Sequence, residues 1–215
     1  MGQRSQIYFR INKETGGYYL VARYFQWNYG TRMISRARGL LEWLDSNSDY
    51  PYALYDEKWN ASKVIRIIDT NFDYKDVCIS RDIIADCNDP DYGWDLLFHD
   101  DNNDGKLMVD MVVDWESKDK KGDHPIILKY AFTDSSNELL MDAEQYMSWN
   151  GNDEEDDGSV IPWRESKYIK REVKYTERNI KKIDKLATLM TQEELNEYLN
   201  HDYSKDMGAK KERVS

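Results

Sequence analysis

The chain has 215 residues and a formal net charge of −11, and 13% of its residues are aromatic. Disordered chains are poor in aromatic residues, so the composition predicts a chain that folds over most of its length. Residues 81–160 carry 22 acidic and 6 basic side chains, a local charge of −16, which favours a basic protein partner and argues against direct binding to nucleic acid or membrane.

The N-terminal third predicts a hairpin followed by a helix. Residues 5–12 and 18–26 alternate and are rich in β-formers, and the turn signal of residues 13–17 separates them. Over residues 32–45, apolar side chains recur at helical spacing. Arg32, Arg36 and Arg38 on this helix are either a solvated face, which we favour, or an anion-binding face.

The middle of the chain predicts short elements. Asn60 can cap a short helix that runs through Ile68. Residues 94–98 and 107–113 flank a polar stretch and predict a second hairpin, and residues 125–132 are the clearest single strand. A capping box formed by Asp142 with Gln145 predicts a further short helix.

Beyond residue 150 the composition changes. Residues 151–160 are acidic and of low complexity and predict a mobile linker. Thr176 can cap a helix through Met190, and the capping-box spacing of Thr191 and Glu194 predicts another helix.

These elements predict an α+β fold. We expect an antiparallel sheet of hairpins with one packed amphipathic helix, followed by a helical C-terminal segment. The predicted organisation is a globular domain (1–150), an acidic linker (151–160), a helical C-terminal segment (161–203) and a disordered tail (204–215).

One short motif has the spacing of a metal site. Asp100, Asn102 and Asp104, followed by Gly105, match the first, third, fifth and sixth positions of a calcium loop. The twelfth position, normally a bidentate Glu, is Met111, so a hairpin tip with Asp-Gly at its turn is the favoured interpretation. Weak calcium binding is the alternative, and we expect no other cofactor.

The acidic run within the linker is the candidate partner-binding site; its members are Asp153, Glu154, Glu155, Asp156 and Asp157. A solvated loop is the simplest interpretation of such a run. A recognition element for a basic protein surface is the functional one. Metal binding is less favoured, because adjacent carboxylates on a flexible loop lack fixed geometry.

The sequence assigns no catalytic residues. His99, His124 and His201 are scattered, and no nucleophile, phosphate-binding or zinc-protease motif accompanies them. The first residues lack the apolar segment of a signal peptide, so we expect a cytoplasmic protein of a bacterium or of a phage-infected cell, with Cys78 and Cys87 reduced. No run reaches the roughly 20 apolar residues that span a bilayer.

Four segments carry a resemblance to a known family: MGQRSQIYFRI, ARYFQWNYGTRMISRARGLLEWL, DDNNDGKLMVD and MDAEQYMSW. The chain resembles a family of small uncharacterised proteins of Firmicutes, their phages and mobile elements. The resemblance implies a bacterial or prophage setting and, by analogy, an inhibitor of host defence such as an anti-CRISPR protein.

Our leading hypothesis is therefore a non-enzymatic acidic protein that binds a basic protein, such as one that itself binds nucleic acid. The alternatives are a calcium-binding module, a metal-dependent hydrolase or nuclease, and an immunity protein.

Overall fold

The computed structural model describes residues 3–46, 57–70, 80–82 and 103–206. A seven-stranded sheet forms its centre, with the order β3-β2-β1-β4-β5-β6 and with β9 also paired to β5. The strands are β1 (Arg4–Asn12), β2 (Tyr18–Gln26), β3 (Ser80–Asp82), β4 (Lys106–Val113), β5 (Ile126–Thr133), β6 (Leu140–Met141) and β9 (Thr188–Leu189). The helices are α1 (Thr31–Ser46), α2 (Glu57–Thr70), α4 (Ala143–Asn150), α5 (Val173–Leu186), α6 (Gln192–Asn200) and α7 (Tyr203–Asp206).

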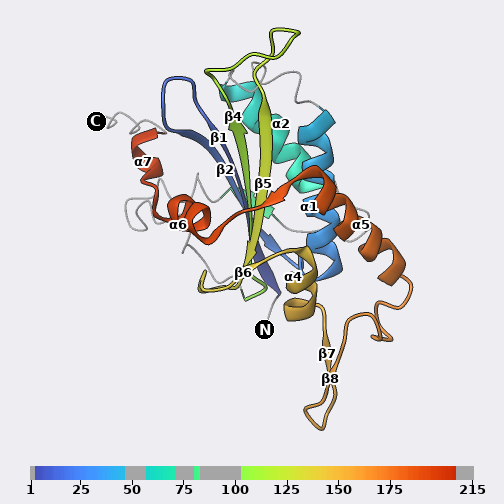
Figure 1. Cartoon of the computed structure of the whole chain (residues 1–215). Helices are drawn as coiled ribbons and strands as arrows, with labels where there is room; N and C mark the ends of the chain where they lie inside the picture. The colour runs from blue at the N-terminus through green and yellow to red at the C-terminus, as the bar shows by residue number, and fades with distance from the viewer. Residues whose placement is uncertain (1–2, 47–56, 71–79, 83–102, 207–215) are drawn as a thin grey trace, which may run out of the picture.

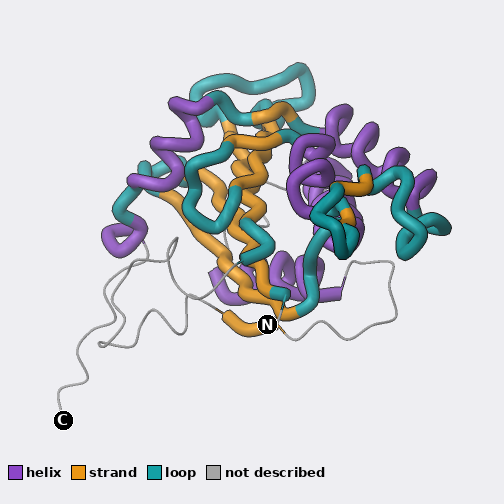
Figure 2. The backbone as a smooth tube through the Cα atoms, turned by 90° about the horizontal axis from the view of Figure 1, so that it is seen from below, coloured by secondary structure: helices purple, strands orange, loops and turns teal. Residues whose placement is uncertain are grey.

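Both faces of the sheet are covered by helices. Successive residues of a strand point to opposite sides of the sheet, so each strand contributes to both cores. In β1, Ile7, Phe9 and Ile11 face a core that also contains apolar side chains of α1, α2, α4 and α5. Tyr8 faces a second core, which contains side chains of α6 and α7. Figures 1 and 2 show α6 and α7 on the opposite side of the sheet from α1 and α5.

The α+β fold is confirmed, and so are its most local elements. β1 and β2 pair as the predicted antiparallel hairpin, with Asn12 opposite Tyr18. Helix α1 and strand β5 lie within about one residue of the predicted ranges. Both capping boxes form: Asp142 begins α4 and Thr191 begins α6.

The predicted pairing of the central strands is wrong. β4 pairs in parallel with β1 on one edge and antiparallel with β5 on the other, so it has no edge left for a hairpin with residues 94–98. Those residues lie outside the described ranges. The β9–β5 pair is also parallel, and the sheet is therefore mixed, although mostly antiparallel. A parallel pair needs a long crossover, and the chain between β1 and β4 provides it.

The helix starts that rest on a single capping residue are also wrong. α2 begins at Glu57, upstream of Asn60. α5 begins at Val173, and Thr176 is buried inside it. A lone polar residue ahead of an apolar run is compatible with several starts, whereas a capping box fixes one by two reciprocal hydrogen bonds.

The solvated-face interpretation of the three arginines is wrong for Arg36, which is completely buried. Its Nε donates to Asn28 Oδ1 at 3.1 Å, Nη1 donates to the carbonyl of Ile68, and the guanidinium lies 4.4 Å from the centre of the Phe25 ring. Arg38 pairs with Glu42. Arg36 therefore fixes the end of α2 against α1, and no common arginine face forms.

The C-terminal segment packs on the main sheet and on α1, in the same globular unit as the N-terminal elements. α5 packs on α1, β9 joins the sheet, and α6 covers the second face. Ser204 and its neighbours up to Asp206 belong to α7, so ordered chain continues beyond the predicted start of the tail. Residues 207–215 lie outside the described ranges.

A row of charges fixes α6 to the second face of the sheet. Arg10, Asp110 and Lys129 are direct neighbours across β1, β4 and β5. From α6, Glu197 accepts a hydrogen bond from Arg10 at 2.7 Å, and Glu194 pairs with Lys129. The alternating signs along the row therefore complement two acidic side chains one helical turn apart.

Arg10 is the centre of this row. Its side chain is buried between the rings of Tyr18 and Tyr198, 4.1 and 4.2 Å from their centroids, and it donates to Asp110 at 2.8 Å. Burial alone would lower the pKa of Arg10, but hydrogen bonds to Asp110 and Glu197 outweigh it and raise the pKa. Burial raises the pKa of Asp110 more than Arg10 lowers it.

Candidate functional site

The acidic run folds as a hairpin in place of the predicted linker. β7 (Asp153–Glu154) pairs antiparallel with β8 (Val160–Ile161) in a separate two-stranded sheet. Glu155 N donates to Ser159 O, and Gly158 N donates to Glu155 O, each at 2.9 Å. Gly158 has a φ of +81°, the left-handed conformation that closes a three-residue hairpin loop. Figure 1 shows this hairpin projecting beyond α4, away from the main sheet.

The charges of the hairpin face solvent. Glu154, Glu155, Asp156 and Asp157 are all exposed. Within the described ranges, the one ion pair that these residues make joins Glu155 to Lys167, with the atoms 4.0 Å apart. Hydrogen bonds from Ser159 lower the pKa of Asp157, so this carboxylate is charged at neutral pH.

The base of the hairpin is fixed on both sides. Asn152 accepts a hydrogen bond from the Trp163 backbone at 2.8 Å and donates to the Ser148 carbonyl at 2.7 Å. Trp163 is only 1% exposed and belongs to the main core. Beyond it, Arg164 forms ion pairs with Glu144 of α4 and Glu177 of α5. The hairpin therefore extends from a rigid support.

A pocket of about 570 Å³ lies at the base of the hairpin. Five segments line it: the residues just before β1 and just before β4, the turn into α1, the end of α4 with the start of β7, and the chain before α5. We call it the hairpin-base pocket. Its lining residues are Gln3, Tyr29, Gly30, Thr31, Arg32, Asp104, Met147, Asn150, Gly151, Asn152, Asp153, Tyr168, Ile169 and Glu172.

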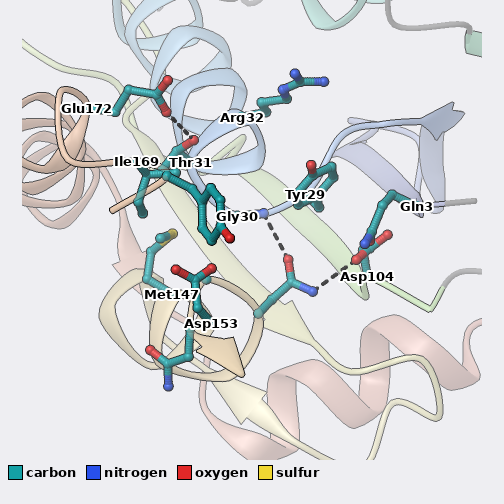
Figure 3. Close-up of a pocket in the computed structure, with 14 residues that line it drawn as sticks. Gln3, Tyr29, Gly30, Thr31, Arg32, Asp104, Met147, Asp153, Ile169 and Glu172 are labelled. Carbon is teal, nitrogen blue, oxygen red and sulfur yellow. Dashed lines mark hydrogen bonds between the residues drawn. The ribbon is translucent and has the colours of Figure 1, made fainter. Parts of the chain in front are cut away.

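Figure 3 shows how the labelled side chains lie around the pocket. Thr31 and Glu172 lie on the α1 side, where the Thr31 hydroxyl donates to Glu172 at 2.9 Å. Asp153 and Met147 lie on the opposite side. The Arg32 guanidinium points away from Glu172 and Asp153, lies 5.7 Å from the centre of the Tyr29 ring, and donates to the Trp27 carbonyl at 3.0 Å.

Asp104, a member of the predicted calcium loop, is a structural residue at one end of this pocket. It is 3% exposed, and its carboxylate accepts hydrogen bonds from the Arg4 backbone and from the Asn150 amide. Asn150 in turn accepts from the Gly30 backbone at 2.8 Å. Asp104 thus connects the first strand, α4 and the start of α1.

The other two members of the predicted calcium loop, Asp100 and Asn102, lie outside the described residues. Among the side chains that the structure describes, no group of three or more His, Cys, Asp or Glu is placed to hold a metal ion. Gly105, the turn residue of the motif, has a φ of +79° and leads directly into β4.

The structure brings together Asp104 and Asp153, which the sequence analysis assigned to separate sites. Both line the hairpin-base pocket. The contributions of Tyr29, Tyr168 and Glu172 were missed, because residues about 140 positions apart meet only through the packing of α5 on α1.

Each of the two histidines that the structure describes contacts residues close to it in the sequence. His124 Nδ1 lies 2.8 Å from the Ser117 carbonyl and 3.0 Å from that of Asp114. His201 Nε2 pairs with Asp206 at 2.5 Å. His99 and both cysteines lie outside the described ranges.

Comparisons with known proteins add no family or relative. No protein-family model, curated protein or solved structure matches this chain. Within the described ranges, no helix is long and apolar enough to cross a bilayer.

Proposed function

We propose that this chain is a non-enzymatic interaction protein whose β7–β8 hairpin binds a basic surface of a partner protein. One observation carries the proposal: four consecutive acidic residues, 154–157, are exposed on a hairpin that projects from the body. Their charge is neutralised within the described chain only by one long ion pair to Lys167.

The geometry suits electrostatic recognition. A cluster of like charges on a protruding element reaches a partner first and accelerates encounter at low salt. The ordered hairpin also reduces the conformational entropy lost on binding, compared with a flexible acidic tail. Among possible partners, proteins that bind nucleic acids carry the basic surfaces that such a hairpin complements.

We extend the proposal to a setting in a phage or mobile element, where such a protein would inhibit a host defence factor. The partner's basic groove would then be occupied by carboxylates in place of phosphates. The support for this setting is the family resemblance of the sequence together with the acidic hairpin.

The experiment compares two charge-matched variants. In the hairpin variant, Glu154→Gln, Asp156→Asn and Asp157→Asn remove three negative charges from the hairpin. In the control, Glu116→Gln, Glu138→Gln and Glu193→Gln remove three from exposed positions elsewhere. Binding to an immobilised nona-arginine peptide is measured between about 50 and 300 mM salt.

We expect the hairpin variant to bind about tenfold more weakly at low salt, and the control to change by less than about twofold. The affinity of the unmodified protein should fall steeply with salt. Equal losses in both variants would show that only net charge matters and would overturn the proposal.

A further inference from the structure

The hairpin-base pocket is continuous with the acidic hairpin. Asp153 is the first residue of β7 and also lines the pocket. A partner that extends along the hairpin to its base would therefore reach the pocket. We infer that the pocket receives the guanidinium group of an arginine of that partner, an inference that rests on the proposed function.

The charge of the lining favours a cation. Three carboxylates line the pocket, those of Asp104, Asp153 and Glu172, against the single guanidinium of Arg32. Asp104 is engaged by the Arg4 backbone and Asn150, and the Arg32 guanidinium points away from the carboxylates of Asp153 and Glu172 (Figure 3). Glu172 accepts a hydrogen bond from the neutral Thr31 hydroxyl, which leaves its charge in place, so the lining as a whole is net negative.

Asp153 has an unmet hydrogen-bonding capacity. Its Oδ2 atom is out of contact with solvent and has no hydrogen-bond donor among the described residues. A buried carboxylate oxygen without a donor is costly, and a charged donor is the group that best offsets the cost. A guanidinium in the pocket would supply that donor once the Asp153 carboxylate turns to present Oδ2 to it, and its planar fork can bind both oxygens of a carboxylate.

The aromatic lining favours arginine over lysine. Tyr29 and Tyr168 contribute rings to the pocket, and Tyr168 is 76% exposed. The Lys167 ammonium lies 5.3 Å from the centre of the Tyr168 ring, and the Arg32 guanidinium lies 5.7 Å from that of Tyr29, so both rings already attract cations. A planar guanidinium would stack on the remaining exposed face of Tyr168. A volume of about 570 Å³ accommodates an arginine side chain, since ligand pockets span roughly 300–1,000 Å³.

The test uses N-acetyl-arginine amide as the probe and N-acetyl-citrulline amide as its uncharged isostere. Binding is followed through the backbone amide NMR signals of Gly30, Thr31 and Asp153. We expect saturable shifts with the arginine probe at millimolar concentration and none with the citrulline probe. N-acetyl-lysine amide should bind at least about threefold more weakly, since it cannot form the bidentate contact.

Two pocket variants and one control separate local from long-range effects. Asp153→Asn should raise the dissociation constant about tenfold. Tyr168→Leu, at an exposed position where folding is not at risk, should raise it about threefold by removing the ring. Glu138→Gln removes one negative charge, as Asp153→Asn does, from an exposed position outside both the pocket and the hairpin, and it should change the constant by less than about twofold.

The inference is overturned if the citrulline probe binds as well as the arginine probe, if the pocket amides do not shift, or if Asp153→Asn and Glu138→Gln have equal effects. These failures are distinct from failure of the proposed function. If the hairpin variant loses nona-arginine binding while the pocket amides ignore the arginine probe, only the pocket inference falls. If the probe binds the pocket but the hairpin variant matches its control, only the proposed function falls.

Discussion

Replacing Arg10 with Met should destabilise the fold strongly, because it leaves a buried carboxylate without its partner. The side chains of Arg10 and Asp110 are 2% and 7% exposed, and breaking such a pair by removing one member costs about 3–5 kcal/mol. The second partner, Glu197, is 51% exposed, and a half-exposed pair contributes at most about 1 kcal/mol. Glu197→Gln should therefore cost about 1 kcal/mol or less.

The assay is urea or thermal unfolding monitored by circular dichroism. For a chain of this size, 1 kcal/mol corresponds to roughly 2–4 °C in Tm, so Arg10→Met should lower Tm by roughly 6–20 °C. The double variant Arg10→Met with Asp110→Leu removes the buried charge altogether and should recover most of the loss. A loss for Arg10→Met no larger than that for Glu197→Gln would refute the reasoning.

The same variant should show a defined pH dependence. Burial raises the pKa of Asp110 in the folded protein, and the hydrogen bond from Arg10 opposes that rise. Without Arg10 the pKa rises further. A folded pKa above the unfolded value contributes stability below the unfolded pKa, and that contribution is lost as the pH rises through the folded pKa. The deficit of Arg10→Met should therefore shrink from about pH 7 to pH 4, and a deficit independent of pH would exclude a charge-based cause.

Two further predictions concern the calcium-loop motif. Gly105→Ala should destabilise the fold by about 2–4 kcal/mol, because φ is +79° and an added Cβ would collide with the Thr133 carbonyl of β5. Gly122→Ala, at a φ of +92° with open space around it, should cost only about 1 kcal/mol, and equal losses would show that the collision is unimportant. Millimolar calcium should leave Tm unchanged, because the Asp104 carboxylate is engaged by protein donors; a rise in Tm or a change in tryptophan fluorescence would restore the calcium-binding alternative.

The parts of the fold that could be predicted are those in which cause and effect are close in sequence. The β1–β2 hairpin depends on one turn, and each capping box depends on four consecutive residues, as at Asp142 and Thr191. The parallel β1–β4 pair joins residues about 100 positions apart, such as Arg10 and Asp110. β1 pairs with β4 because the two strands bury their apolar faces in the same core. Local sequence patterns do not specify such a pairing.

The two Asp-Gly dipeptides show that a local turn signal does not by itself specify which strands pair. It occurs as Asp104–Gly105, where a hairpin tip was predicted, and as Asp157–Gly158, where a mobile linker was predicted. The structure has the hairpin at Gly158, where flanking strands of only two residues each are too short to show a strand pattern in the sequence. At Gly105 the positive φ instead starts β4, which is inserted between β1 and β5.

The described part of the acidic block, residues 103–160, therefore contains carboxylates in different settings. Asp104, Asp110 and Asp142 are engaged inside the fold by hydrogen bonds, an ion pair and a helix cap. The acids at 154–157 are exposed on a supported hairpin and have almost no counter-charge within the described chain. Because only charges that are not neutralised internally attract a partner at close range, affinity for a basic surface should follow the position of the removed charge. Net charge alone would predict equal behaviour for the hairpin variant and its control, which makes that comparison decisive.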